Sequence, residues 1–188
     1  FPRVKIVASD DLDERKILEL RSRGAEIDVY GVGTRLVTGG EQAALGVVYK
    51  LSAVRESASE PWRPVMKLSS TAAKRSLPGH VEVQRIVRDG KLAGDFLSLG
   101  PDEPSALVGA REALLRPAIR GGRVAPEYPL DLASARERAR AELVRLPDGA
   151  FHLDAPEVLS VELSPRLDEL QAELVERAAP AAATSVQP

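Results

Sequence analysis

The sequence predicts an α/β fold, and three observations support this prediction. An apolar strand at residues 4–8 is followed by a helix and by a second apolar strand at residues 27–32. Further along, two alternating segments flank Asp89-Gly90, a dipeptide typical of tight hairpin turns. Ser164-Pro165 then starts a last helix with a cap residue and a proline at its first position. Parallel and antiparallel strands in one chain indicate a mixed architecture.

The first helix has recognisable signals at both ends. Asp11 is followed three residues later by Glu14, which is a capping-box pattern, and Asp13 is a second acidic residue in the same turn. Ile17 lies on the apolar face, and Gly24 is a candidate for the C-terminal end. Strand, helix and strand together form a βαβ unit, which predicts a parallel pair of strands.

Glycine and polar residues follow both of these strands. Ser9 and Asp10 follow the first strand, and Gly31, Gly33 and Thr34 follow the second. The carboxyl ends of parallel strands meet at one edge of a sheet, which is where ligands of α/β folds bind. Glycines leave backbone N–H groups uncovered, and Thr34 adds a hydroxyl, so these loops predict a phosphate site. The alternative is that the glycines only make a tight turn.

Three carboxylates in the first loop argue against a phosphate site, because Asp10, Asp11 and Asp13 would repel a phosphate. We expect Asp11 and Asp13 to face away and cap the helix. Asp10 is left open: it could face away, bind ribose hydroxyls or act through a cation.

The later segments predict further strands and helices. Residues 47–54 and 64–69 are strand-like, with a polar loop between them, and residues 82–88 and 91–99 form the hairpin around Asp89-Gly90. Residues 132–146 predict a helix with a solvated face of arginines and glutamates. The last helix would bury a stripe of Leu167, Leu170 and Leu174. Residues 179–188 have low complexity and are expected to form a disordered tail.

Composition excludes several classes of protein. The chain has 188 residues, of which 44% are hydrophobic and 29% are charged, as in ordinary globular proteins. A formal net charge of −2 gives no sign of a nucleic-acid partner or a membrane surface, and we expect neither. The absence of cysteine excludes disulfides and fits a reducing compartment, so we expect a cytoplasmic protein.

The first residues of the chain suggest that it is part of something larger. It opens on Phe1-Pro2-Arg3 and passes directly into an apolar strand. Parallel strands of this kind are buried on both faces and need neighbours, and none precedes this one. We therefore expect the chain to be the C-terminal part of a longer protein. The alternative is that only a short leader has been removed.

The motifs of this chain resemble those of nicotinate phosphoribosyltransferases. The resemblance begins with "VKIVASDDLDERKILELRSRGAEIDVYGVGTRLVT" and continues with "ALGVVYKL". The segments "PVMKLS", "LPG", "LLRPAIRGGRV" and "VELSP" follow in the order of the family, so the resemblance extends to about residue 175. A departure occurs at residues 78–85, "PGHVEVQR", where the family usually carries two more basic residues and an aromatic residue.

The resemblance implies an activity and a fold. Members of the family join nicotinate to phosphoribosyl pyrophosphate, which gives nicotinate mononucleotide and pyrophosphate. The reaction is coupled to ATP hydrolysis through a phosphorylated histidine, and Mg²⁺ accompanies the pyrophosphate. The implied fold is the C-terminal part of an irregular (β/α) barrel followed by segments of a second mixed α/β domain. Because family sites lie at subunit boundaries, a homodimer is expected for the full-length protein.

The implied substrate site lies in the first part of the chain. Thr34 matches a threonine that contacts the phosphoribosyl substrate, and Gly31 and Gly33 match glycines of the same loop. Ser9 and Asp10 match the neighbouring loop, where related nicotinamide enzymes bind a 5′-phosphate. By this comparison residues 1–46 form the last barrel strands and the phosphate-binding loops. Residues 47–178 form the return segment and the second domain, and residues 179–188 form the tail.

The catalytic groups of the family are expected upstream of this chain. They include the phosphorylated histidine and the residues that hold nicotinate, so we name no catalytic or metal-binding residue here and expect the isolated chain to be inactive. His80 and His152 match no family motif and are expected in solvated loops. The choice between nicotinate and nicotinamide is not encoded in this part.

Three further points are left open by the sequence. Lys50, Lys67 and Lys74 are either surface charges or cations that neutralise pyrophosphate at a subunit boundary. Another phosphate-binding α/β-barrel enzyme would use the loop glycines equally well, although it does not account for the downstream motifs. A non-catalytic fragment or paralogue, serving as a binding or assembly module, would account for the missing catalytic groups.

Overall fold

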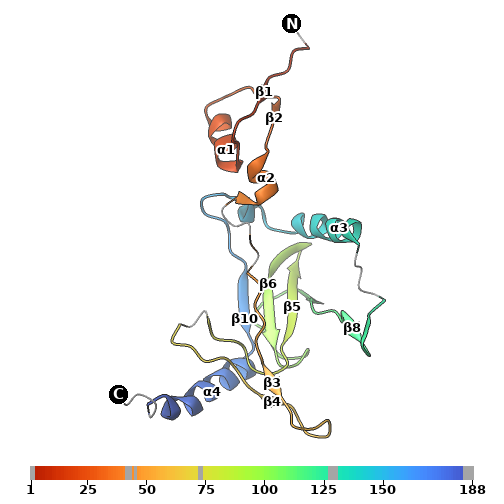
Figure 1. The fold of residues 1–188 in the computed structure, drawn as a ribbon, viewed down its shortest axis with the longest axis vertical. Helices are drawn as coiled ribbons and strands as arrows, with labels where there is room; N and C mark the ends of the chain where they lie inside the picture. The colour runs from red at the N-terminus through yellow and green to blue at the C-terminus, as the bar shows by residue number, and fades with distance from the viewer. Residues whose placement is uncertain (1–2, 41–43, 45, 72–73, 127–130, 184–188) are drawn as a thin grey trace. The chain divides into compact units, whose positions relative to one another are not determined.

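The structure is a computed structural model that describes residues 3–40, 44, 46–71, 74–126 and 131–183. The chain divides into two compact units, Phe1–Tyr49 and Lys50–Pro188, and each is considered by itself. Both contain helices and strands, which confirms the mixed α/β class (Figure 1). The sheets formed by the described residues are open, so a closed barrel stays a prediction.

The first unit contains the predicted βαβ arrangement (Figure 1). Its elements are β1 (Val7–Ala8), α1 (Glu14–Ser22), β2 (Val29–Tyr30) and α2 (Thr34–Thr38). Strands β1 and β2 are parallel, with Val7 opposite Val29, as the sequence predicts. Both strands are shorter than predicted. Pairing continues before them nevertheless, because the carbonyl of Ile6 accepts hydrogen bonds from the amides of Asp28 and Val29.

The start of α1 differs from the sequence prediction. Asp13 is the N-cap residue, and its side chain accepts a hydrogen bond from the amide of Lys16 at 2.8 Å. The predicted capping box of Asp11 and Glu14 is therefore wrong, because Glu14 is already the first helical residue. Asp11 has a φ of 45°, so the chain is still turning there. Gly24 follows the end of the helix with a positive φ, as expected.

The second unit is built on a four-stranded sheet (Figure 1). Strands β5 (Glu82–Arg88) and β6 (Lys91–Ser98) form the predicted antiparallel hairpin, with positive φ angles at Asp89 and Gly90. Strand β7 (Ala110–Ala113) pairs with β5 on one side, and β10 (Ser160–Leu163) lies parallel to β6 on the other. The strand order is therefore β10-β6-β5-β7, and the sheet is mixed.

Two short hairpins, two α helices and a 3₁₀ helix are also formed by the described residues of this unit. The predicted strands at 47–54 and 64–69 are much shorter in the structure. They are β3 (Ala53–Val54) and β4 (Arg63–Pro64), which pair in antiparallel orientation. The second hairpin consists of β8 (Ile119–Arg120) and β9 (Arg123–Val124). The helical segments are α3 (Leu132–Leu143), the 3₁₀ helix η3 (Asp148–Phe151) and α4 (Pro165–Ala183). Helix α4 thus extends five residues into the expected tail, and residues 184–188 lie outside the described residues.

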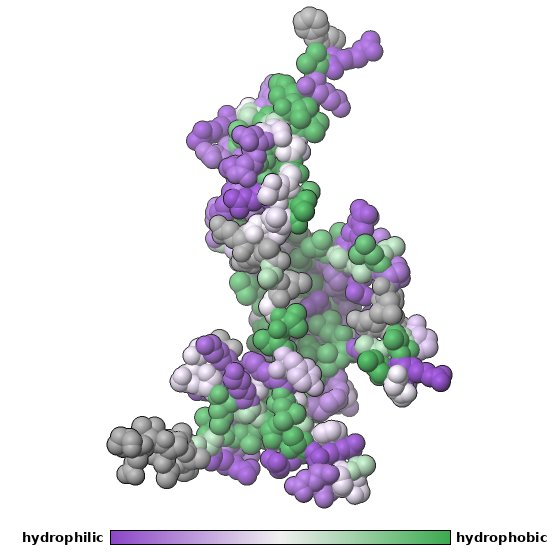
Figure 2. All heavy atoms as spheres, in the orientation of Figure 1, coloured by the Kyte–Doolittle hydropathy of each residue, from purple (hydrophilic) through white to green (hydrophobic). Residues whose placement is uncertain are grey.

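The core of the second unit lies between the sheet and α4. Phe96 and Ile86 from the sheet and Leu167 from α4 are fully buried. The hydroxyl of Ser164 accepts the amide of Leu167 at 3.2 Å, which confirms the predicted start of α4. Among described hydrophobic residues of the first unit, by contrast, Leu12 alone is buried. Apolar residues appear on the surface of the molecule in Figure 2.

The helices give no sign of a membrane span. None of the helices formed by the described residues combines the length and the apolar character needed to cross a bilayer.

Candidate functional site

The two predicted phosphate loops lie side by side at the carboxyl ends of β1 and β2. The amide of Gly31 donates a hydrogen bond to the carbonyl of Ala8 at 2.7 Å. The hydroxyl of Ser9 lies 3.4 Å from the carbonyl oxygen of Gly31. A β-carbon on Gly31 would lie 3.1 Å from this hydroxyl oxygen and 3.3 Å from the Ser9 β-carbon. The close approach of the two loops therefore accounts for a glycine at position 31.

Gly33 has no close neighbour of this kind. Its φ is −112°, and a β-carbon built on it would meet no described atom within 4 Å. Thr34 follows as the first residue of α2, and its side chain is exposed. No hydrogen bond from the Gly33 or Thr34 amide to another described residue is seen. These two residues thus present backbone donors and a hydroxyl to the outside of the unit.

The acidic loop is held in an unusual conformation. Asp10 and Asp11 have φ angles of 94° and 45°, in the left-handed region that non-glycine residues seldom adopt. The Asp11 carboxylate lies 3.2 Å from the Lys16 ammonium and 3.8 Å from the Nε of Arg35. Lys16 also donates to the Asp11 carbonyl at 2.7 Å. The charge of the Asp11 carboxylate is thus balanced by two cations, which the sequence did not predict. Asp10 is exposed, and its role is left open.

A backbone hydrogen bond favours the charged form of the third acidic residue of this loop. The backbone N–H of Lys16 donates to the carboxylate of Asp13 and lowers its pKa below the ordinary value of 3.8. This carboxylate belongs to the cap of α1 and is directed to the helix backbone. The prediction that Asp13 is a cap is therefore confirmed, and the cap accounts for one of the three carboxylates that oppose a phosphate.

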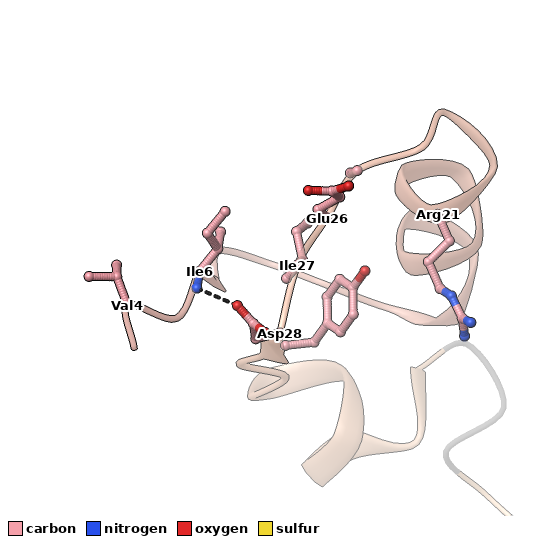
Figure 3. Close-up of a pocket in the computed structure, with 8 residues that line it drawn as sticks. Val4, Ile6, Arg21, Glu26, Ile27 and Asp28 are labelled. Atoms are coloured by element: carbon pink, nitrogen blue, oxygen red, sulfur yellow. Dashed lines mark hydrogen bonds between the residues drawn. The ribbon is translucent and has the colours of Figure 1, made fainter. Parts of the chain in front are cut away.

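A hollow of about 610 Å³ lies in the same unit. Its walls come from the segments that precede β1 and β2, from Tyr30 at the end of β2 and from Arg21 at the end of α1 (Figure 3). The Ile6 amide donates to the Asp28 carboxylate at 2.8 Å, which closes one side (Figure 3). None of the five predicted site residues lines the hollow. Most of its lining lies before the strands begin, whereas α/β folds place their ligands at the carboxyl ends.

The described residues do not form a metal centre. No group of three or more histidine, aspartate or glutamate side chains among them is arranged to hold a metal ion. His80 is exposed, with its Nδ1 3.9 Å from a Glu82 carboxylate oxygen, and His152 is exposed as well, as expected for loop histidines. Lys50 donates to the carbonyl of Lys74 at 3.3 Å, which gives no indication of a ligand.

Known proteins resemble this chain over almost its whole length. No family model matches it. Bovine nicotinate phosphoribosyltransferase is 33% identical over 195 residues, which cover 94% of this chain and 35% of the bovine protein. The human protein of the same name is 34% identical over 89% of this chain and 33% of its own length. This chain is homologous to nicotinate phosphoribosyltransferases. The Bacillus subtilis nicotinate phosphoribosyltransferase is 43% identical over 101 residues, which cover 53% of this chain.

The structural comparison agrees with this homology. The crystal structure of human nicotinic acid phosphoribosyltransferase matches with a TM-score of 0.59 and 28% identity. The match covers 92% of this chain and 33% of the human chain. This chain therefore spans about a third of the length of the nicotinate phosphoribosyltransferases that match most of it.

Proposed function

We propose that this chain carries the phosphoribosyl-binding loops of a nicotinate phosphoribosyltransferase, which forms nicotinate mononucleotide from nicotinate and phosphoribosyl pyrophosphate. In this proposal Gly31, Gly33 and Thr34 contact the 5′-phosphate from one loop. Ser9 and Asp10 approach it from the other. The homologues carry the name of this activity, and the reaction places their substrates in the biosynthesis of NAD.

The observation that carries the proposal is the contrast between the two glycines. Gly31 is explained by the approach of Ser9, whereas a β-carbon at position 33 would meet no described atom within 4 Å beyond its two chain neighbours. A residue without a side chain and with an unpaired amide allows a ligand to come close to the backbone. A phosphate bound there would accept hydrogen bonds from the amide of Gly33 and from the amide and hydroxyl of Thr34.

The other parts of the proposal rest on the resemblance. They are the irregular barrel, coupling to ATP hydrolysis, Mg²⁺ with the pyrophosphate, a homodimer and a cytoplasmic location. The described residues hold no three-ligand metal site, so we assign no step to a metal from them. The catalytic histidine would come from residues outside this chain, and the isolated chain would be inactive.

The test is the variant Thr34→Ala in the natural full-length protein. A charge-assisted hydrogen bond to a phosphate contributes roughly 1.5–3 kcal/mol. Loss of the hydroxyl should therefore raise the KM for phosphoribosyl pyrophosphate roughly ten- to a hundredfold, at about 1.4 kcal/mol per decade. The KM for nicotinate should change much less. Steady-state kinetics with each substrate varied in turn measures both values.

Thr38→Ala is the matched control, because Thr38 lies at the other end of α2 and its hydroxyl donates to the carbonyl of Thr34 at 2.8 Å. This control should keep both KM values within about twofold, since surface substitutions usually have small effects. If Thr34→Ala behaved like this control, the loop would be a tight turn and not a phosphate site. A full-length protein that bound no phosphoribosyl compound would favour the non-catalytic module.

A further inference from the structure

Arg35, the cation that follows the glycine loop, contacts the loop that follows β1. Arg35 is the second residue of α2, directly after Thr34, and its Nε lies 3.8 Å from the Asp11 carboxylate. Asp11 belongs to the loop that follows β1, 24 positions earlier in the chain. The Arg35 guanidinium therefore stands at the edge where the candidate phosphate loops converge. Its side chain keeps 41% of its surface exposed.

The contacts of Arg35 leave most of its donors available. A guanidinium carries five N–H donors, and only the Nε of Arg35 faces Asp11. No contact of its two terminal nitrogens with another described residue is seen. Those nitrogens form the planar fork that binds two phosphate oxygens at once.

Lys16 already neutralises the charge of the Asp11 carboxylate, so Arg35 is not needed for this. The Lys16 ammonium contacts the Asp11 carboxylate at 3.2 Å and its carbonyl at 2.7 Å, both shorter than the contact with Arg35. The acidic loop thus has a cation of its own. Asp11 can then orient the guanidinium of Arg35 through this ion pair, while the terminal nitrogens make no contact with another described residue.

We propose that Arg35 is a further substrate-binding residue, which binds a phosphate group of the phosphoribosyl substrate. In this proposal Asp11 positions the Arg35 side chain. The inference rests on the proposed function and names a group that the family motif does not assign. The ligand chemistry is a phosphate monoester or a diphosphate. Both are parts of phosphoribosyl pyrophosphate, and the two can be distinguished by experiment.

The experiment compares Arg35→Ala, Arg35→Lys and a control in the natural full-length protein. Arg35→Ala should raise the KM for phosphoribosyl pyrophosphate about tenfold, the scale of one charge-assisted contact at an exposed site, and change kcat less than about threefold. Arg35→Lys keeps the charge but loses the fork, so we expect an intermediate rise of about threefold. Arg23→Ala is the control, because Arg23 is an exposed arginine of the same unit that pairs with Glu19. It should leave the KM unchanged.

Direct binding identifies the phosphate that Arg35 contacts. Calorimetric titration with ribose 5-phosphate and, separately, with pyrophosphate should show weaker binding of one probe by Arg35→Ala and little change for the other. Loss of ribose 5-phosphate binding assigns the monoester, and loss of pyrophosphate binding assigns the diphosphate.

Two results separate this inference from the proposed function. If Thr34→Ala raises the KM but Arg35→Ala leaves it and both probes unchanged, the role of Arg35 is refuted and the phosphate loop stands. If neither variant changes the KM, both ideas fail. Arg35→Ala could instead lower the melting temperature as well as weaken binding, with Arg35→Lys restoring both in full. In that case Arg35 only holds the two loops together, and the inference is wrong.

Discussion

Gly31 and Gly33 are two residues apart in one loop, yet they differ in what a side chain would meet. At Gly31 a β-carbon would lie 3.1 Å from the Ser9 hydroxyl oxygen, so the neighbour would have to shift. At Gly33 a β-carbon would meet no described atom within 4 Å. The sequence motif treats the two glycines alike, because it records the residue type and not the space around it.

This difference gives a prediction for a matched pair of valine variants in the natural full-length protein. Gly31→Val should lower the free energy of unfolding by about 1 kcal/mol, because overpacking against Ser9 has about this cost. Gly33→Val should lower it less but should weaken binding of phosphoribosyl pyrophosphate at least about tenfold, since the branched side chain covers the free amides. Urea denaturation and titration measure the two effects. An equal loss of stability in both variants would show that the fold itself needs Gly33.

At the scale of elements, Glu162 ties β10 to the loop before β7. Its carboxylate accepts hydrogen bonds from the Ala106 amide at 2.9 Å, the Ser105 hydroxyl at 3.0 Å and the Leu107 amide at 3.2 Å. The Ala106 amide is the main cause that lowers the pKa of Glu162 below its ordinary value of 4.5, and the other two donors and Arg111 add to it. The carboxylate form therefore holds this loop in place.

The lowered pKa predicts how the stability of this loop depends on pH. A group with a depressed pKa in the folded state stabilises that state above its unfolded pKa, and this contribution is lost as the pH falls through the folded value. Glu162→Gln should therefore be less stable than the unchanged protein at pH 7, and the difference should disappear well below pH 4.5. Urea denaturation at pH 7, 5 and 3 measures it. Glu173→Gln, an exposed position on α4, is the control, and a pH-independent difference at Glu162 would argue against the charge.

Local signals predicted some elements well, whereas the pairing of β10 with β6 left no signal in the sequence. Asp89-Gly90 and Ser164-Pro165 carry their own turn and cap chemistry, so the β5–β6 hairpin and the start of α4 were predicted from a few residues. The parallel pairing of Gly94 with Ser160 joins segments 66 positions apart and leaves no local pattern. A β-carbon on Gly94 would lie 2.7 Å from the Ser160 carbonyl oxygen, so the close approach of β10 requires a glycine here. The sequence alone does not show this approach.

The candidate site shows the same limit. Parallel pairing of β1 and β2 follows from the βαβ pattern, and with it the meeting of Ser9 and Gly31. The spacing of Asp11 to Glu14 fits a capping box, but the left-handed turn at Asp11 moves the helix start to Asp13, the other predicted capping residue. The same turn brings the Asp11 carboxylate near Arg35, a contact that residue spacing does not encode.

At the scale of the whole molecule, the two units differ in how much apolar surface they bury. The second unit has Phe96 and Ile86 fully buried in a four-stranded sheet. In the first unit, Val7 of β1 is 62% exposed and Val29 of β2 is 44% exposed. Small units that bury little apolar surface have little free energy to offset the entropy of folding. Exposed apolar strand edges also favour association with other chains.

We therefore predict that the isolated 188-residue chain opens first at β1 and β2. Amide hydrogen exchange in β1 and β2 should be at least roughly a hundredfold faster than in β5 and β6, because local opening costs little where few apolar groups are buried. The chain should also bind a hydrophobic dye. Val7→Thr combined with Val29→Thr should reduce this binding, whereas the control Val158→Thr, at a site in the second unit that is 85% exposed, should reduce it less. Equal protection of both strand pairs, with no dye binding, would mean that the first unit folds stably by itself. The exposed valines would then be ordinary surface residues, and not a face that needs a partner.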